Sequence, residues 1–282
     1  MDWLSAKENK IPIGKMIKSV SDFLVEYCGP FFDLIIFVVD SLFNGTVFLL
    51  TVIPAVAFIA LVSALSYFLQ RSLKLTLFIL AAQLLILNLG YWEASMETVA
   101  LIIWTTVLCM LIGVPIGIAA AHRARVWTAL NPVLDLMQTI PVFVYLIPAI
   151  TLLGLGATPG VFATIIFVLP APIRLTYLGV SSVPTQLIEA AESFGATKKQ
   201  LLWKVEIPYA MPSIMAGLTQ TIMLSLSMIV IASMVAAPGL GVDVLRSISQ
   251  YNEVKGYESG LAIALIAIML DRMLKRRKKE GK

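Results

Sequence analysis

Few residues in this chain are of the types that could carry out a reaction on their own. Its 282 residues include one histidine, His122, and two cysteines, Cys28 and Cys109. A single histidine excludes a zinc site built on histidines, and two distant cysteines do not indicate a disulfide framework. The sequence contains neither a Gly-x4-Gly-Lys-Ser/Thr phosphate loop nor a Gly-x-Ser-x-Gly nucleophile elbow. We therefore expect no catalytic residue, no metal site and no cofactor bound by this chain.

Three polar residues lie where a long uncharged run begins. Asp135, Gln138 and Thr139 stand at the start of the run Leu136–Ile173. Polar groups inside a membrane are expensive, so they are candidates for a translocation pathway by default. The alternative is that they cap the start of a helix that follows Asn131-Pro132. The sequence favours neither interpretation over the other.

Two further residues, Tyr145 and Met228, are predicted to contribute to the same pathway or its gate. Met228 belongs to a stretch rich in small or flexible side chains, which are Met223, Ser225, Ser227, Ser233 and Met234. Such side chains suit a helix that repacks during gating. Ordinary helix packing explains them equally well.

The composition indicates that the helices holding these residues lie in a membrane. Hydrophobic residues make up 59% of the chain, charged residues 13%, and the mean hydropathy is +0.90. Soluble proteins carry about 25% charged residues, so this chain is expected to lie in lipid as an all-α polytopic membrane protein. A helix crosses a bilayer in about 20 apolar residues. The uncharged runs then predict about seven spans: Thr46–Leu69, Leu75–Trp92, Thr98–Ala121, two within Leu136–Ile173 divided at Gly154–Gly160, one within Tyr209–Val242, and Ser259–Leu270.

Charge in the connecting loops predicts the orientation of the chain. Basic loops follow the first, third and fifth spans, whereas the loops after the second, fourth and sixth are acidic, neutral or mixed. The basic tail 275–282 follows the seventh span. Because basic loops stay in the cytoplasm, the C-terminus is expected inside and the N-terminus outside. A basic tail can also bind nucleic acid, but after an apolar segment we interpret it as a topological signal and expect no nucleic-acid partner.

Residues 1–45 do not fit the pattern of the permease domain that we assign to residues 46–274. The stretch Ile13–Phe43 mixes apolar residues with charges, and Asp33 and Asp40 lie one heptad apart. An amphipathic helix lying on the outer membrane surface fits this pattern. The alternative, an eighth span, would bury two carboxylates.

The cytoplasmic loop 181–212 between the fifth and sixth predicted spans is the most informative stretch. A helix is expected to start just after Pro184 and to end at Gly195. Its apolar face would hold Leu187, Ala191 and Phe194 by i, i+4, i+7 spacing. A second short helix should follow, and Pro208 should start the return to the membrane. The segment therefore predicts a compact helix-turn-helix.

The same loop resembles the EAA loop of ABC importer permeases. Glu189-Ala190-Ala191 is followed by three residues and Gly195, then by nine residues and Val205, and then by Glu206 and Ile207-Pro208. The family pattern has Ile and Leu where this chain has Val205 and Ile207. The resemblance implies a coupling helix that seats in a groove of a separate ATPase, with Glu189 and the two alanines in contact and Gly195 at the turn. The alternative is an ordinary amphipathic loop helix resting on the membrane.

Five further segments resemble the permeases of glycine betaine and proline betaine importers, of the MetI-like type. These segments are Leu89–Trp92, Gly113–Gly117, Leu134–Thr139, Pro141–Pro148 and Ala236–Gly241. The resemblance implies an osmoprotectant substrate, a homodimeric permease in the bacterial inner membrane, and an external binding protein. It also implies two ATPase subunits that bind ATP and Mg in place of this chain.

Two other classes of membrane protein are alternatives to this resemblance. An ion-coupled secondary transporter would more often place acidic residues deep in its spans. A membrane-embedded enzyme would need clustered nucleophiles, carboxylates or histidines. Nearly all charges here lie at predicted span ends or in loops.

Overall fold

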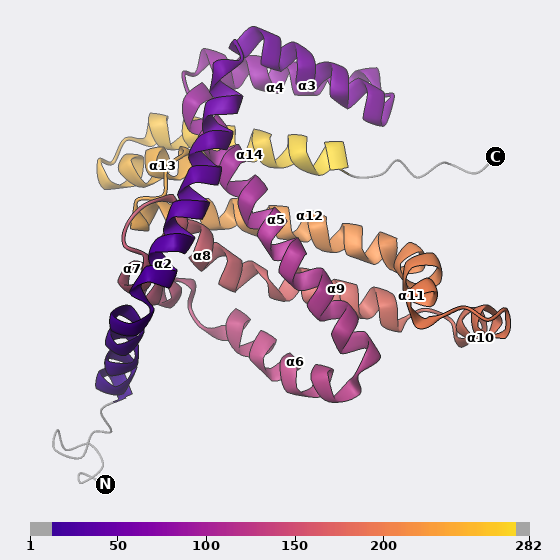
Figure 1. Cartoon of the computed structure of the whole chain (residues 1–282). Coiled ribbons are helices and arrows are strands. Elements are labelled where there is room, and N and C mark those ends of the chain that lie inside the picture. Colours follow the sequence, from indigo (N-terminus) through magenta and orange to yellow (C-terminus); the bar gives the residue numbers. More distant parts are fainter. Residues whose placement is uncertain (1–12, 275–282) are drawn as a thin grey trace, which may run out of the picture.

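The computed structural model describes residues 13–274, which are helical almost throughout and contain no strand in that range. Helices satisfy their own backbone hydrogen bonds, as a chain rich in apolar residues must do in lipid. The expectation of an all-α fold is thus confirmed. The helices that form the bundle are α3 (Ala55–Gln70), α4 (Leu73–Asn88), α5 (Trp92–His122), α6 (Ala124–Thr139), α8 (Ala157–Val168), α9 (Pro170–Ser181), α12 (Ile207–Ala232) and α14 (Glu253–Leu274). The others are α2 (Ile13–Val52), α7 (Leu146–Leu153), α10 (Thr185–Ser193), α11 (Lys198–Leu201) and α13 (Leu240–Ser249) (Figure 1).

Four helical runs in the described part are long and apolar enough to cross a membrane. These runs are Gly14–Val52, Trp92–His122, Ala157–Ser181 and Lys198–Val235. A bent pair, Ala124–Thr139 and Val142–Leu153, makes a fifth if it is counted as one span. Helices α3 and α4 are apolar but have 16 residues each, and α14 carries charged residues toward both ends. Length and composition therefore support fewer spans than the seven expected.

Two of the expected spans have different shapes in the structure. The prediction of a single span over Thr46–Leu69 is wrong, because α2 ends at Val52 and α3 begins at Ala55 after Pro54. Proline lacks the backbone N–H that a continuing helix needs and disfavours helical geometry in the residue before it. The expected fourth span bends by 104° between Thr139 and Val142. Pro141, with an extended ψ of 131°, lies at that bend.

Helix α2 lies across one end of the bundle rather than along it (Figure 1). The Trp104 Nε1–H donates to Thr46 Oγ1 at 2.9 Å, and the Thr158 hydroxyl donates to Asp40 Oδ1 at 2.6 Å. These bonds tie α2 to α5 and α8. The direction in which α2 crosses the bundle agrees with the predicted surface helix. The helix is also long and apolar enough to span a membrane. Its placement on the membrane surface therefore stays a prediction. The domain boundary expected at residue 45 falls inside α2, and residues 1–12 and the tail 275–282 lie outside the described range.

Small residues bring the central helices close together. A Cβ on Gly117 of α5 would lie 2.7 Å from the Ile173 carbonyl oxygen of α9. A Cβ on Gly179 of α9 would lie 2.7 Å from the Cβ of Ser213 in α12. Helices in membranes pack through such small residues. Helix α9 is therefore held between α5 and α12, and this packing fixes the point from which α10 emerges.

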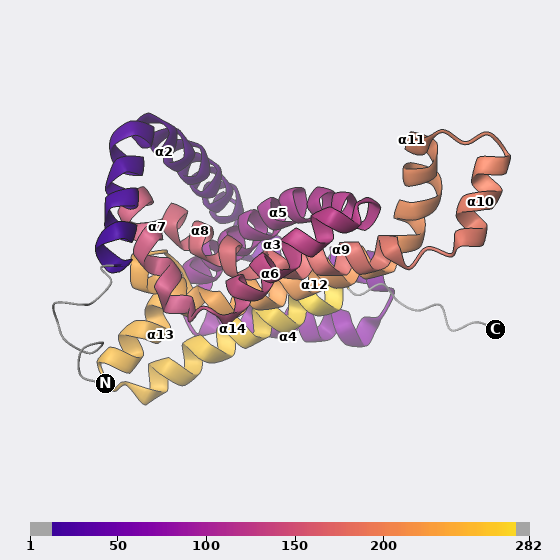
Figure 2. The same ribbon diagram turned by 90° about the horizontal axis from the view of Figure 1, so that it is seen from below.

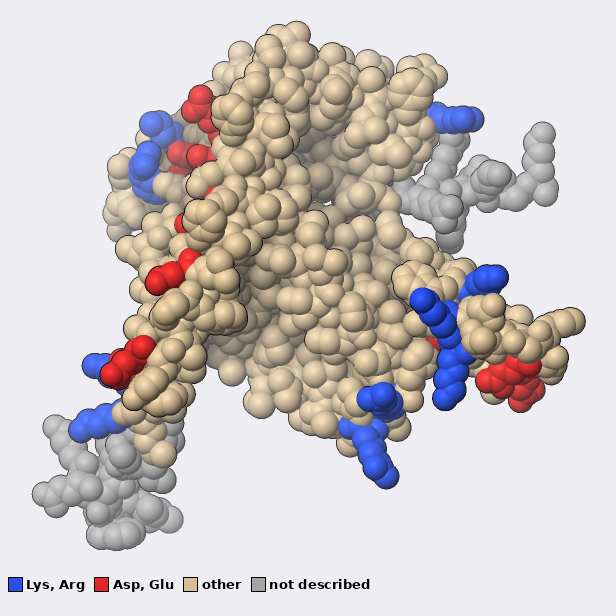
Figure 3. Space-filling model, in the orientation of Figure 1, with Lys and Arg blue, Asp and Glu red and all other residues tan. Residues whose placement is uncertain are grey.

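Charge is distributed unevenly between the two ends of the bundle. Figure 3 shows acidic side chains along α2, at the end that also carries α13. Basic side chains gather toward the other end, where α10 and α11 lie, but some also lie on α2 and near α13, and acidic side chains lie on α10. The basic residues at this second end include Arg123, Arg125, Lys198, Lys199 and Lys204.

Candidate coupling loop and translocation pathway

Helix α10 carries Glu189, Ala190 and Ala191 and stands clear of the bundle. It begins at Thr185 directly after Pro184, as expected, although no side chain caps its N-terminus. None of its nine residues, all within the described range, is buried. Figure 2 shows α10 and α11 projecting from one end of the molecule. The helix is therefore available to a partner along its whole length.

The turn expected at Gly195 is present and depends on glycine. Its φ is +78°, in the left-handed region that residues with a Cβ rarely adopt. The Gly195 N–H donates to the Glu192 carbonyl at 2.8 Å, and the Ala196 N–H donates to the Ala191 carbonyl at 3.1 Å. These two bonds form a Schellman motif, which satisfies the last carbonyls of α10 and sets the direction of the following chain.

The second helix of the loop runs directly into the membrane helix. Thr197 and Gln200 form a capping box at the start of α11, with the Thr197 N–H donating to Gln200 Oε1 at 2.8 Å. A π-helical turn, Leu202–Glu206, then joins α11 to α12. Pro208 lies at the start of α12, as expected, but the helical run is continuous from Lys198 to Val235, so the short second helix is not separated from the membrane helix. Pro208 lies in the first turn of α12, where a proline is tolerated, and Val205 and Ile207 are half-buried on either side of the junction.

A hydrogen-bonded pair that the sequence did not predict lies at the base of this loop. The His122 Nε2 and Glu206 Oε2 atoms are 2.8 Å apart and join the end of α5 to the π-helical turn. Glu206 is 5% exposed and is the only buried charged residue in the described part of the chain. A buried carboxylate is stable only with a partner. No spacing rule links two residues 84 positions apart, so the pair could not have been found from the sequence.

Large apolar side chains of the loop face outward. Leu187 is 45% exposed, Trp203 62% and Phe194 93%. The predicted apolar face of α10 is therefore unoccupied in the isolated chain. Exposed apolar side chains gathered in one place mark an interaction site.

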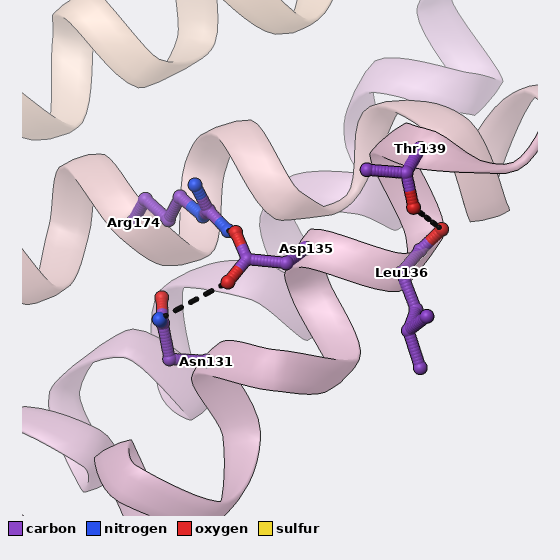
Figure 4. Close-up of polar contacts among 5 residues, drawn as sticks. All are labelled: Asn131, Asp135, Leu136, Thr139 and Arg174. Atoms are coloured by element: carbon purple, nitrogen blue, oxygen red, sulfur yellow. Dashed lines mark hydrogen bonds and ion pairs between the residues drawn. The ribbon is translucent and has the colours of Figure 1, made fainter.

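Asp135 takes part in a polar cluster beside α9 (Figure 4). The Arg174 Nη2 donates to Asp135 Oδ1 at 2.6 Å, and the Asn131 Nδ2 donates to Asp135 Oδ2 at 3.3 Å. The helix-start interpretation of these residues is wrong, because α6 begins at Ala124 and Asp135 lies in its second half. Pro132 lies inside α6 and does not begin it.

The other predicted pathway residues are divided between two places. Gln138 and Thr139 are exposed in the last turn of α6, where the Thr139 hydroxyl donates to the Leu136 carbonyl at 3.2 Å. Tyr145 is buried, and its hydroxyl donates to the Met137 carbonyl at 2.9 Å, across the bend that follows α6. Met228 is 1% exposed within α12. Met228 is therefore a packing residue in this conformation.

The structure shows a groove that was not expected from the sequence. Its volume is about 660 Å³, and it runs along α12 beside the end of α14. Met211, Met215, Thr219 and Met223 follow one another at intervals of four residues along one face of α12. This spacing is visible in the sequence and could have indicated the groove. No group of three or more His, Cys, Asp or Glu residues able to hold a metal occurs within residues 13–274.

We expect the Asp135–Arg174 pair to contribute little to stability. The side chains are 55% and 34% exposed, and open ion pairs are worth about 0–1 kcal/mol. Asp135→Asn should therefore change the free energy of unfolding by less than about 1 kcal/mol. Denaturant unfolding of the detergent-solubilised chain measures it, with Arg174→Gln and the double variant completing the cycle. A coupling energy well above this range would show that the pair is a structural anchor of α6.

Comparison with known proteins agrees with the arrangement of these elements. The family model described as "binding-protein-dependent transport system inner membrane component" matches residues 113–272. The chain is 43% identical to the glycine betaine transport system permease protein OpuAB of Bacillus subtilis (strain 168), over 94% of this chain and 93% of that protein. It is 43% identical to the glycine betaine/proline betaine transport system permease protein ProW of Escherichia coli (strain K12), over 93% of this chain and 74% of that protein.

A solved structure shows the same fold at lower identity. The methionine ABC transporter MetNI, in inward facing conformations, has a chain that superposes with a TM-score of 0.57 and 20% identity. The match covers 63% of this chain and 91% of that chain. The family match and the two permeases show that the chain belongs to the inner membrane components of binding-protein-dependent transport systems. Within that family it belongs to the glycine betaine and proline betaine permeases of the MetI-like type.

Proposed function

We propose that this chain is the membrane-spanning permease subunit of an ATP-driven importer for glycine betaine or a related osmoprotectant. The relatives at 40–43% identity over most of the chain carry glycine betaine in their names. The chain lacks a phosphate loop, so a separate subunit must supply the energy of ATP hydrolysis, with ATP and Mg bound there. Alternating access in the permease would follow the movement of that subunit.

One observation carries this proposal: an exposed coupling helix with an unoccupied apolar face. Glu189, Ala190 and Ala191 lie on α10, which projects from the bundle, and Phe194 at its end is 93% exposed. The two alanines allow close approach, Glu189 offers a charged contact, and Phe194 offers an aromatic side chain of the kind enriched in protein interfaces. The ATPase subunit is the partner that we assign to this face.

Charge supports the proposed orientation. The end that carries α10 holds most of the basic residues, and the end that carries α2 and α13 holds more acidic ones (Figure 3). Basic residues remain on the cytoplasmic side. The coupling loop and the C-terminus therefore face the cytoplasm, and α2 faces the external binding protein.

The groove on α12 supports a second copy of the permease. Its methionine-lined face is open in the isolated chain, although it lies along a helix otherwise packed in the bundle. A homodimer would close two such grooves into one passage, each copy carrying its own ATPase subunit. Met223 would face that passage.

Removal of the aromatic anchor tests the coupling role. Phe194→Ala should weaken binding of the ATPase subunit by about tenfold, as loss of a hot-spot aromatic does. The measurement is retention of the co-expressed ATPase through purification in mild detergent, together with ATP-dependent uptake of labelled glycine betaine into proteoliposomes. Tyr251→Ala is the matched control, because Tyr251 is also 93% exposed but lies beside α13, at the opposite end of the bundle.

Two results would contradict the proposal. Equal loss of the ATPase in the Phe194 and Tyr251 variants would show that the exposed face of α10 is not the ATPase-binding site. Uptake by the chain alone, driven by a sodium or proton gradient, would identify a secondary transporter instead.

A further inference from the structure

Two polar residues, Thr219 and Gln220, lie at the midpoint of α12 on the face that forms the methionine-lined groove. Twelve residues separate Thr219 from Ile207 at the start of the helix, and twelve separate Gln220 from Ala232 at its end. With the α-helical rise per residue, each lies about 18 Å from the nearer end. Gln220 is exposed, Thr219 is half-buried, and both line the groove of about 660 Å³. Two accessible polar side chains therefore lie at the level of the bilayer centre.

Neither side chain has a hydrogen-bond partner within the described part of the chain. On the same helix, the hydroxyls of Thr221, Ser225 and Ser227 each donate to a backbone carbonyl one turn earlier, at 2.8, 2.8 and 3.1 Å. No such bond engages the Thr219 hydroxyl or the Gln220 carboxamide. Polar groups at this depth are costly against lipid and mark a passage or a binding site. The open face of α12 is therefore assigned to a passage rather than to the bilayer.

Methionine side chains flank the two polar groups along the groove. Met215 lies one turn before Thr219, Met223 lies one turn after it, and both line the groove. The thioether of methionine is polarisable and accepts hydrogen bonds only weakly. No described lining residue is aromatic, and the one that is charged, Asp271, lies in the last turn of α14, toward the end of the bundle that carries α10 and α11 (Figure 1). The middle of the groove thus combines neutral donors with polarisable apolar surfaces.

A second copy of the chain would double this set of groups. Copies related by a two-fold axis along the membrane normal present the same patch to each other. Their α12 helices then run parallel, and residues of the same number face each other across the passage. Two hydroxyls and two carboxamides would meet at one level, between a pair of Met215 and a pair of Met223 side chains. This step rests on the homodimer and the substrate class proposed above.

These groups fit a zwitterion that carries a carboxylate and a quaternary ammonium. The carboxylate can accept hydrogen bonds from the Gln220 N–H groups and from the Thr219 hydroxyl, and bonds to an ionised acceptor are stronger than neutral ones. A quaternary ammonium has no N–H to donate, so its methyl groups suit the methionine thioethers. A cation without a carboxylate would leave the four donors of the two copies unused.

We propose that Thr219 and Gln220 form a transit site for the carboxylate of the transported zwitterion, with its quaternary ammonium held against Met215 or Met223. The groove lacks the aromatic box with which proteins bind quaternary ammonium groups tightly. The transit site therefore binds its cargo weakly, as a passage must in order to release it.

Saturation-transfer NMR of the substrate methyl protons tests this site directly. The complex of the permease with its ATPase is placed in nanodiscs without the binding protein and titrated with glycine betaine. Tetramethylammonium, which lacks a carboxylate, is the second probe. Gln220→Leu should weaken glycine betaine binding by about tenfold, the effect of one hydrogen bond to a charged group. The same substitution should leave tetramethylammonium binding unchanged, a difference that a merely structural role would not produce.

A matched control variant is available on the same helix. Ser227 is exposed and lies two turns beyond Gln220, but it does not line the groove, and its hydroxyl already donates to the Met223 carbonyl at 3.1 Å. Ser227→Ala should therefore leave the binding of both probes unchanged. Light scattering of each purified variant shows whether the substitution disturbs the dimer.

Three outcomes would overturn the transit site. Equal binding of glycine betaine to the native complex and to Gln220→Leu would show that the carboxamide does not hold the substrate. Equal weakening of both probes would assign Gln220 a structural role. Loss of the dimer in Gln220→Leu would show that the carboxamide pairs with the second copy instead.

A parallel measurement separates this inference from the proposed function. ATP-dependent uptake of glycine betaine is measured with the native complex and its binding protein in proteoliposomes. Absence of uptake would contradict the proposed function itself. Uptake accompanied by any of the three outcomes above would contradict only the transit site.

Discussion

A chain carrying Gly195→Asp is expected to reach the membrane intact and to lose transport. Gly195 has a φ of +78°, and a Cβ at this position would meet nothing within 4 Å. The substitution therefore causes no clash, but it adds about 1–2 kcal/mol of backbone strain to the turn that ends α10. It also places a third carboxylate beside Glu189 and Glu192. We expect glycine betaine uptake to fall by about tenfold or more, the effect of losing a hot-spot contact.

A control substitution at Gly90 distinguishes the effect of backbone strain from the effect of losing the ATPase subunit. Gly90 has a φ of +80° and equally open surroundings, but it lies between α4 and α5, far along the chain from the coupling loop. Gly90→Asp should therefore carry similar strain and retain uptake. The measurements are the amount of membrane-inserted chain, retention of the ATPase and uptake. Normal uptake with Gly195→Asp would remove the coupling role of this turn, as would equal losses in the two variants.

The sequence predicted the two ends of α10 correctly because the signals for them are local. Pro184 and Gly195 mark the two ends of α10 within a few residues, and each acts through backbone geometry that needs no distant partner. The motif from Glu189 to Pro208 also lies within 20 consecutive residues, so it needs no distant part of the chain to be recognised. What the sequence could not show is that α11 joins α12 through a π-helical turn, because helical register across such a junction depends on packing against α5.

The spans were predicted less well, because hydropathy records length but not direction. The uncharged run that includes Thr46–Leu69 reads as one crossing, yet Pro54 divides it between α2 and α3. Helix α2 also shows that hydropathy cannot distinguish a helix that crosses lipid from one that lies across the end of a bundle. Tertiary bonds such as that from Thr158 to Asp40 decide its path, and these join residues 118 positions apart.

The candidate pathway shows the same limit for individual side chains. Asp135, Gln138 and Thr139 lie within two turns of one helix, and their role in a translocation pathway stays a prediction. Met228 was grouped with them on residue type alone, and the structure buries it inside the bundle. Which face of α12 turns outward is set by its packing against α9, and this packing places Met211, Met215 and Met223 in the groove.

The pair formed by His122 and Glu206 is expected to control how movement of the coupling loop reaches the membrane helices. Glu206 lies in the π-helical turn that links α11 to α12, and His122 ends α5. Turns of this type inside α-helices are frequent at functional sites, since they hold an extra residue that can be released by a register shift. A force on α10 and α11 would act on this turn first, and the pair anchors the turn to α5.

Loss of the histidine should therefore reduce both stability and coupling. His122→Leu leaves the Glu206 carboxylate buried without its partner, and we expect the free energy of unfolding to fall by about 2 kcal/mol. We also expect fewer glycine betaine molecules transported per ATP hydrolysed. Arg123→Leu is the matched control, because it removes a charge next to His122 and leaves the pair intact. Denaturant unfolding and the ratio of uptake to ATP hydrolysis in proteoliposomes provide the two measurements.

The double variant His122→Leu/Glu206→Leu separates a structural role from a coupling role. Replacing both members of a pair that contains a buried carboxylate by apolar residues often restores stability, because no unpaired charge remains. We therefore expect the unfolding free energy of the double variant to return to within about 1 kcal/mol of the native chain. If the pair transmits movement, the transport ratio stays low although stability has recovered. If that ratio recovers together with stability, the pair only holds α5 against the base of the loop, and the movement must pass through the packing of α9 between α5 and α12.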